Sequence, residues 1–150
     1  MNLYQKRKVK NKILDGVDCV MFEKILVPID GSEISKKAVS KAVEMAKELG
    51  STIVVANIMN QKNSFSFDMQ DDESRDFVSA MVDYIKGEDV AVESMILFGS
   101  PEFDIEKVAR KSEADVMLLG CNVKESLDDP IGSFTKASIR HVKLPIILIK

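Results

Sequence analysis

The feature that most constrains the fold of this chain is an alternation of apolar runs with amphipathic segments from residue 22 to residue 150. Runs of aliphatic and β-branched residues predict strands, and apolar residues at three- and four-residue spacing predict the helices between them. Strands are expected at residues 24–30, 52–58, 90–98, 115–120 and 145–149. Because strands joined by helical crossovers run parallel, the pattern predicts an α/β fold, a doubly wound parallel sheet with helices on both faces.

Capping residues give the expected ends of the helices. Ser32 stands where it can cap the first helix, and Gly50 stands where that helix would end. Asp71 and Asp72 are expected to open the second helix. Ser100 followed by Pro101 is typical of a helix N-terminus and predicts the start of the third helix.

Length and composition limit the classes of protein. The chain has 150 residues, 45% hydrophobic and 30% charged, which predicts one globular domain. A net charge of −3 favours neither nucleic acid nor an anionic membrane as a partner, and we expect a soluble cytoplasmic protein. Two cysteines, Cys19 and Cys121, and one histidine, His141, cannot complete a structural zinc site without carboxylates, so no metal is expected.

The N-terminal segment differs from the rest of the chain in charge. Residues 1–20 carry five basic side chains against two acidic ones. We therefore divide the chain into a basic N-terminal extension, residues 1–21, and one domain, residues 22–150. A solvated extension is favoured over a phosphate-binding arm. Met21 as an alternative first residue stays open.

A ligand site is expected where the strand order of such a sheet reverses, beyond the carboxyl end of the first strand. This edge should carry Asp30-Gly31-Ser32 and Gly120-Cys121. The chain contains neither the phosphate loop nor the dinucleotide fingerprint, and it also lacks the nucleophile elbow and the His-Glu-x-x-His motif. We therefore expect a protein that is not an enzyme.

Three blocks of sequence resemble the universal stress protein family: KILVPIDGSEISKKAV, GSPEFDIEKVARKSEADVMLLG and IGSFTKASIRHVKLPIILIK. The resemblance covers residues 22–150. It implies a five-stranded parallel sheet of order 3-2-1-4-5, an adenine nucleotide alpha hydrolase-like fold. It also implies a dimeric, cytoplasmic stress-response protein and, in one subgroup, ATP bound at the reversal of strand order.

The ATP-binding subgroup has the pattern Gly-x-x-Gly, nine residues, then Gly-Ser/Thr, and this chain matches it in part. Gly120 matches, and so does Gly132-Ser133. The second glycine is replaced by Val123, and only eight residues separate Val123 from Gly132. The intervening loop contains Pro130, which lacks an amide donor. Against one cation, Lys124, it has three carboxylates that would oppose a phosphate: Glu125, Asp128 and Asp129.

The adenosine side is better preserved. Asp30 matches the family's acidic residue after the first strand, although an Asp before Gly-Ser is also a favourable turn residue. Cys121 is either a thiol of lowered pKa at the pocket mouth or a small residue filling a small space. The candidate nucleotide-binding residues are Pro28, Ile29, Asp30, Ala56, Gly120, Cys121, Val123, Gly132, Ser133, Phe134 and Thr135.

Three functions remain in consideration. The leading one is a stress-response regulator that acts by binding and has a degenerate adenine-nucleotide pocket. The alternative is a sensor that binds ATP or AMP through Gly120 and Gly132-Ser133. The third is a slow nucleotide hydrolase, for which the sequence offers no base or nucleophile.

The expected partner is a second copy of the chain. By the family's strand order, residues 145–149 form an edge strand with four consecutive large aliphatic side chains. Such an edge templates pairing with another chain. We therefore expect a homodimer through this strand.

Overall fold

The computed structural model of the chain describes residues 22–60, 67–123, 128 and 130–150. The expected basic extension, residues 1–21, lies outside the described residues, as do Glu125 and Asp129 of the acidic loop. Strands and helices alternate through the described residues as expected. Their order is β1 (Lys24–Pro28), α1 (Glu33–Leu49), β2 (Thr52–Met59), α2 (Phe67–Gly87), β3 (Val92–Phe98), α3 (Pro101–Ser112), β4 (Val116–Gly120), α4 (Ser133–His141) and β5 (Ile146–Ile149).

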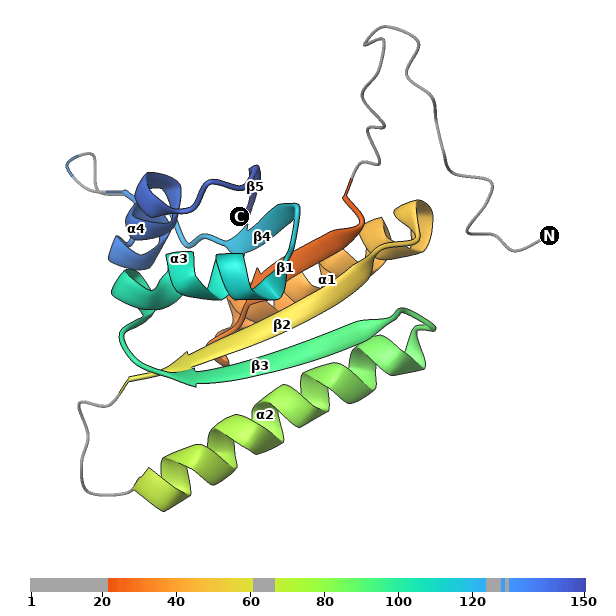
Figure 1. The fold of residues 1–150 in the computed structure, drawn as a ribbon, viewed down its shortest axis with the longest axis horizontal. Coiled ribbons are helices and arrows are strands. Elements are labelled where there is room, and N and C mark those ends of the chain that lie inside the picture. Colours follow the sequence, from red (N-terminus) through yellow and green to blue (C-terminus); the bar gives the residue numbers. More distant parts are fainter. Residues whose placement is uncertain (1–21, 61–66, 124–127, 129) are drawn as a thin grey trace, which may run out of the picture.

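The strands form one parallel sheet in the order β3-β2-β1-β4-β5, which confirms the predicted topology (Figure 1). In the register of the sheet, β1 pairs on one side with β2, Val27 opposite Val55, and on the other with β4, Ile25 opposite Val116. Successive crossovers lead from β1 outward to β3 and then back past β1 to β4. The strand order therefore reverses between β1 and β4.

Two apolar layers hold the helices on the sheet. Side chains alternate along β1, so that Ile25 and Val27 face α1 and α2 while Leu26 faces α3. The first layer continues into α1 through Ala38, Val39 and their neighbours, and the second is completed by α3 and the residues around α4. Because β1 and most of β4 are buried on both faces, their sequences are nearly continuous apolar runs.

Some element boundaries differ from the prediction. Helix α2 begins at Phe67, four residues before Asp71, the expected start. β1 ends at Pro28 because the chain turns at Gly31, whose φ of 86° lies in the left-handed region that glycine tolerates. β3 begins at Val92 rather than at residue 90, because the amide of Val90 bonds back to Ile85 at the end of α2.

The helix caps follow the prediction in one helix and differ in another. Ser32 caps α1, its side chain accepting a hydrogen bond from the amide of Ser35, and Gly50 ends α1 with φ of 71°. Ser100 is the N-cap of α3, but its side chain makes no capping bond. Instead the carboxylate of Asp104 accepts from the amide of Ser100 at 2.8 Å. None of the helices among the described residues is long and apolar enough to cross a membrane.

Leu118 in β4 is fully buried, which makes it a sensitive probe of the core. We predict that Leu118→Ala lowers the free energy of unfolding by about 2–5 kcal/mol, because it removes packed methyl groups and leaves a cavity. Leu148→Ala is the matched control: Leu148 is 37% exposed on the edge strand, and its truncation should cost about 1 kcal/mol. Urea denaturation measures both, and equal losses would contradict this description of the core.

Candidate functional site

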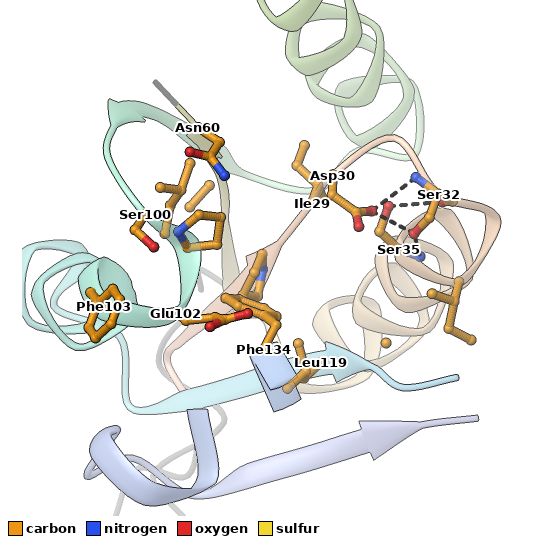
Figure 2. A pocket seen from close by; sticks show the side chains of 16 residues that line it. Ile29, Asp30, Ser32, Ser35, Asn60, Ser100, Glu102, Phe103, Leu119 and Phe134 are labelled. Atoms are coloured by element: carbon orange, nitrogen blue, oxygen red, sulfur yellow. Dashed lines mark hydrogen bonds between the residues drawn. The ribbon is translucent and has the colours of Figure 1, made fainter. Parts of the chain in front are cut away.

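A cavity of about 360 Å³ opens where the strand order reverses. It lies at the carboxyl ends of β1, β2 and β4 and is closed by the first turns of α1 and α3 and by the start of α4 (Figure 2). This is the position at which parallel α/β sheets bind ligands. The lining residues are Pro28, Ile29, Asp30, Ser32, Ile34, Ser35, Ala56, Ile58, Asn60, Ser100, Pro101, Glu102, Phe103, Leu119, Gly120 and Phe134.

The cavity combines apolar and polar walls. Ile29, Ala56 and Leu119 are almost completely buried and continue the core into the wall of the cavity. The polar side chains come from the chain after β1, from Asn60 after β2 and from the start of α3. An apolar slot with a few convergent polar groups is typical of a small-molecule site.

Asp30 is held at the rim by the turn that begins α1. Its Oδ1 accepts hydrogen bonds from the amide of Ser32 at 2.9 Å and from the Ser32 hydroxyl at 2.5 Å (Figure 2). The Ser32 oxygen in turn accepts from the amide of Ser35 at 3.2 Å. Asp30 therefore stabilises the turn before α1, which is one of the two roles considered for it. The same hydrogen bonds orient its carboxylate at the cavity.

Gly120 lets β4 and α1 approach closely. A Cβ atom at Gly120 would lie 2.6 Å from the carbonyl oxygen of Ile34 and 2.9 Å from its carbonyl carbon. Both atoms belong to the backbone of the first turn of α1, so they cannot move aside as a flexible side chain would. Gly120 therefore has a packing role in addition to lining the cavity.

Glu102 connects the two helices on the far side of the cavity. It is the second residue of α3, and its carboxylate accepts a hydrogen bond from the hydroxyl of Ser133, the first residue of α4. The N-cap of α4, Gly132, offers no side-chain capping bond, and the first turn of α4 contains no acidic residue. Glu102 thus brings a negative charge to the positive end of the α4 dipole.

Some of the candidate nucleotide-binding residues come together at the cavity and others do not. Its lining includes Pro28, Ile29, Asp30, Ala56, Gly120 and Phe134. Gly132 and Ser133 are not among the lining residues. Ser133 is nevertheless hydrogen-bonded to Glu102, and Glu102 does line the cavity.

The remaining candidates, Cys121, Val123 and Thr135, are also not among the lining residues. Cys121 was considered for the pocket mouth, but it is 2% exposed, and its amide bonds to Ile149 of β5 at 2.7 Å. Its place fits the reading of a small residue filling a small space. Val123 is 52% exposed and pairs with Ile131 in an isolated antiparallel bridge, and Thr135 is buried.

The start of α3 contributes lining residues that were not predicted from the sequence. Ser100, Pro101, Glu102 and Phe103 all line the cavity. The signal was available: the third helix was predicted to start at Ser100-Pro101, and a helix that follows a parallel strand starts at the ligand-binding edge of the sheet. Within the described part of the chain, no three His, Cys, Asp or Glu side chains gather where they could hold a metal ion.

A family model and a related protein both match this chain over most of its length. The family model described as "Universal stress protein family" matches residues 21–150. A protein of Staphylococcus saprophyticus named as a universal stress protein is 28% identical over 143 residues, which cover 86% of this chain and 84% of the relative.

Two solved structures show the same fold. A universal stress protein from Archaeoglobus fulgidus in complex with dAMP matches with a TM-score of 0.67 and 20% identity, covering 88% of this chain and 100% of that one. A universal stress protein in complex with cAMP matches with a TM-score of 0.68 and 18% identity, covering 85% of this chain and 96% of that one. The fold is therefore the adenine nucleotide alpha hydrolase-like fold of these structures.

The close contact at Gly120 gives a testable prediction. Gly120→Ala should lower the free energy of unfolding by about 1–3 kcal/mol, because the new methyl group meets the backbone of Ile34. Gly87→Ala is the matched control, since nothing lies within 4 Å of its added Cβ; it should be neutral or stabilise α2 by up to about 1 kcal/mol. Guanidinium denaturation compares the two, and an unaffected Gly120→Ala variant would show that the contact with α1 is not tight.

Proposed function

This chain belongs to the universal stress protein family, and we propose that it acts by binding an adenine nucleoside or nucleotide in the cavity beside β1 and β4. The observation that carries the proposal is the position of the cavity, at the reversal of strand order and lined by the ends of β1, β2 and β4. The proposed role is that of a stress-response regulator whose nucleotide pocket is degenerate on the phosphate side.

The shape of the cavity supports an adenine ligand. Ile29, Ala56 and Leu119 form apolar walls against which a flat base can pack. Asp30 at the rim offers a carboxylate that accepts hydrogen bonds from ribose hydroxyls. Adenine nucleotides occupy two solved structures of the same fold, as dAMP and as cAMP.

Binding rather than catalysis is proposed because of the polar groups that line the cavity. Both lining carboxylates, Asp30 and Glu102, already accept hydrogen bonds from serine hydroxyls. The lining residues that the structure describes include no His, Cys, Lys or Arg to act as a general base, a nucleophile or a cationic clamp. Slow nucleotide hydrolysis is the enzymatic alternative, and it is tested by the release of phosphate from ATP.

The phosphate side is proposed to be weak. Val123, which stands where the ATP-binding pattern has glycine, is exposed and bridged to Ile131 rather than placed at the cavity. Of the three glycines in the ATP-binding pattern, Gly120 and Gly132 are thereby left to offer backbone amides to a phosphate.

We predict that ATP binds with a Kd weaker than about 10 μM, corresponding to a binding free energy less favourable than about −7 kcal/mol. Isothermal titration calorimetry on protein shown by mass spectrometry to carry no retained nucleotide is the direct measurement. A submicromolar Kd for ATP would contradict the degenerate phosphate side. Absence of binding by adenosine, AMP and ATP alike would contradict the proposed function itself.

A homodimer through β5 is proposed as the assembly. β5 lies at one edge of the sheet, and Leu148 on this strand is exposed. Ile147 and Ile149 pack instead against the layer between the sheet and α1. Pairing of β5 with its copy across a two-fold axis would satisfy the edge and cover Leu148.

Leu148→Lys is predicted to convert the dimer into a folded monomer, since it places a charge on the exposed part of the edge. Position 147 is less suitable, because a lysine there would disrupt the core as well as the edge. Light scattering at tens of micromolar measures the mass, and circular dichroism checks the fold. A wild-type monomer with native circular dichroism would refute the assembly.

A further inference from the structure

Glu102 gives the cavity a negative charge where a phosphate group would be expected to lie. The start of α4 carries Gly132-Ser133, which matches the phosphate-binding part of the ATP-binding pattern, and the Glu102 carboxylate accepts a hydrogen bond there from Ser133. The contact comes from another helix, α3, so Glu102 supplies the acceptor that α4 lacks in its own first turn. Glu102 therefore acts as an anion built into the protein at this helix terminus.

The other charged group of the cavity is also an acceptor. Asp30 comes from the opposite wall, at the end of β1, and Figure 2 shows it and Glu102 on separate elements around the open centre. Among the described residues that line the cavity, no cationic side chain offsets the two carboxylates. Carboxylate and phosphate oxygens are both hydrogen-bond acceptors, whereas ribose hydroxyls can donate to a carboxylate. The two ends of the cavity thus match a ligand that carries donors at both ends and no negative charge.

The size of the effect follows from Coulomb's law. A ligand with a unit negative charge about 6 Å from one carboxylate, at an effective dielectric constant of about 40, binds about tenfold more weakly than the same ligand without that charge. A Cβ atom added at Gly132, the N-cap of α4, would meet no described atom within 4 Å. The charge of Glu102 alone is therefore large enough to disfavour a phosphate at this end of the cavity.

We propose that Glu102 is a specificity-determining residue that makes this cavity select the uncharged nucleoside adenosine over its phosphorylated forms. The proposal rests on the proposed function, because it assumes that an adenine compound binds in this cavity. It adds the class of ligand and names the residue that sets it.

The test is a calorimetric titration of wild-type protein and of Glu102→Gln with adenosine and with AMP at one ionic strength. Glutamine keeps the size of the side chain and an oxygen acceptor for Ser133 but removes the charge. Wild-type protein should bind adenosine about tenfold or more tightly than AMP. Glu102→Gln should strengthen AMP binding about tenfold while changing adenosine binding less than about threefold.

Glu106→Gln is the matched control, since Glu106 lies on the same helix, pairs with Arg110 at 3.5 Å and does not line the cavity. It should leave both affinities unchanged. Glu102→Ala is a second variant that removes both the charge and the bond to Ser133, and it should also strengthen AMP binding. Melting temperatures confirm that each variant is folded.

The outcomes separate the two proposals. Adenosine and AMP binding equally well to wild-type protein would overturn the role of Glu102 and leave the proposed function standing. A rise in AMP affinity in a Val123→Gly, Asp128→Asn double variant but not in Glu102→Gln would also overturn the role of Glu102. The loop before α4 would then be what weakens AMP binding, and the proposed function would stand. Failure of both ligands to bind any variant would overturn the proposed function, and the specificity with it.

Discussion

The burial of β1 and β4 on both faces is the constraint on which the rest of the structure depends. Because their side chains are apolar in both directions, helices have to cover both faces of the sheet, α1 and α2 on one and α3 and α4 on the other. The chain meets this requirement by crossing outward to β3 and then returning past β1. The carboxyl ends of β1 and β4 are left at the point of reversal, where the helices that follow them diverge and a cavity forms.

Close backbone packing sets the shape of that cavity, and hydrogen bonds set its charge. Gly120 allows the first turn of α1 to rest against the end of β4, which brings the Asp30-Ser32 turn to the rim. On the other side, the bond between Glu102 and Ser133 ties the start of α3 to the start of α4. The starts of α1 and α4 therefore each carry a hydrogen bond to a carboxylate of the protein, and on our proposal the carboxylate at α4 also influences the choice of ligand.

The sequence predicted the fold more completely than the site. Apolar runs such as Thr52–Ile58 and helical spacing are local patterns, so the number, order and type of the elements could be read directly. Boundaries depend on the conformation of turns, as at Gly31, and on hydrogen bonds at the end of a helix, as between Val90 and Ile85, and these were placed less well. Even where the N-cap position of α3 was right, the group that bonds to Ser100 is Asp104, which no local rule required.

For the site, residues at or just beyond the carboxyl ends of strands, such as Gly120 and Asp30, could be predicted because these ends share one edge of a parallel sheet. Glu102 could not be assigned from spacing, because its importance arises from contact with Ser133, thirty-one residues away in the chain. Cys121 follows Gly120 immediately, yet its side chain is buried and does not line the cavity. The direction of a side chain at the end of a strand depends on the backbone conformation of the turn that follows, which the sequence does not specify.

The central claim is that an adenine compound binds at the reversal between β1 and β4, and an amide-resolved NMR titration with adenosine tests it most directly. The account predicts saturable shifts of the amides of Ile29, Ala56 and Gly120, at the ends of three different strands, together with that of Glu102 at the start of α3. Amides far from the cavity, such as Glu88 after α2, should stay unchanged. Saturable shifts confined to another surface, or none at millimolar adenosine, would contradict it.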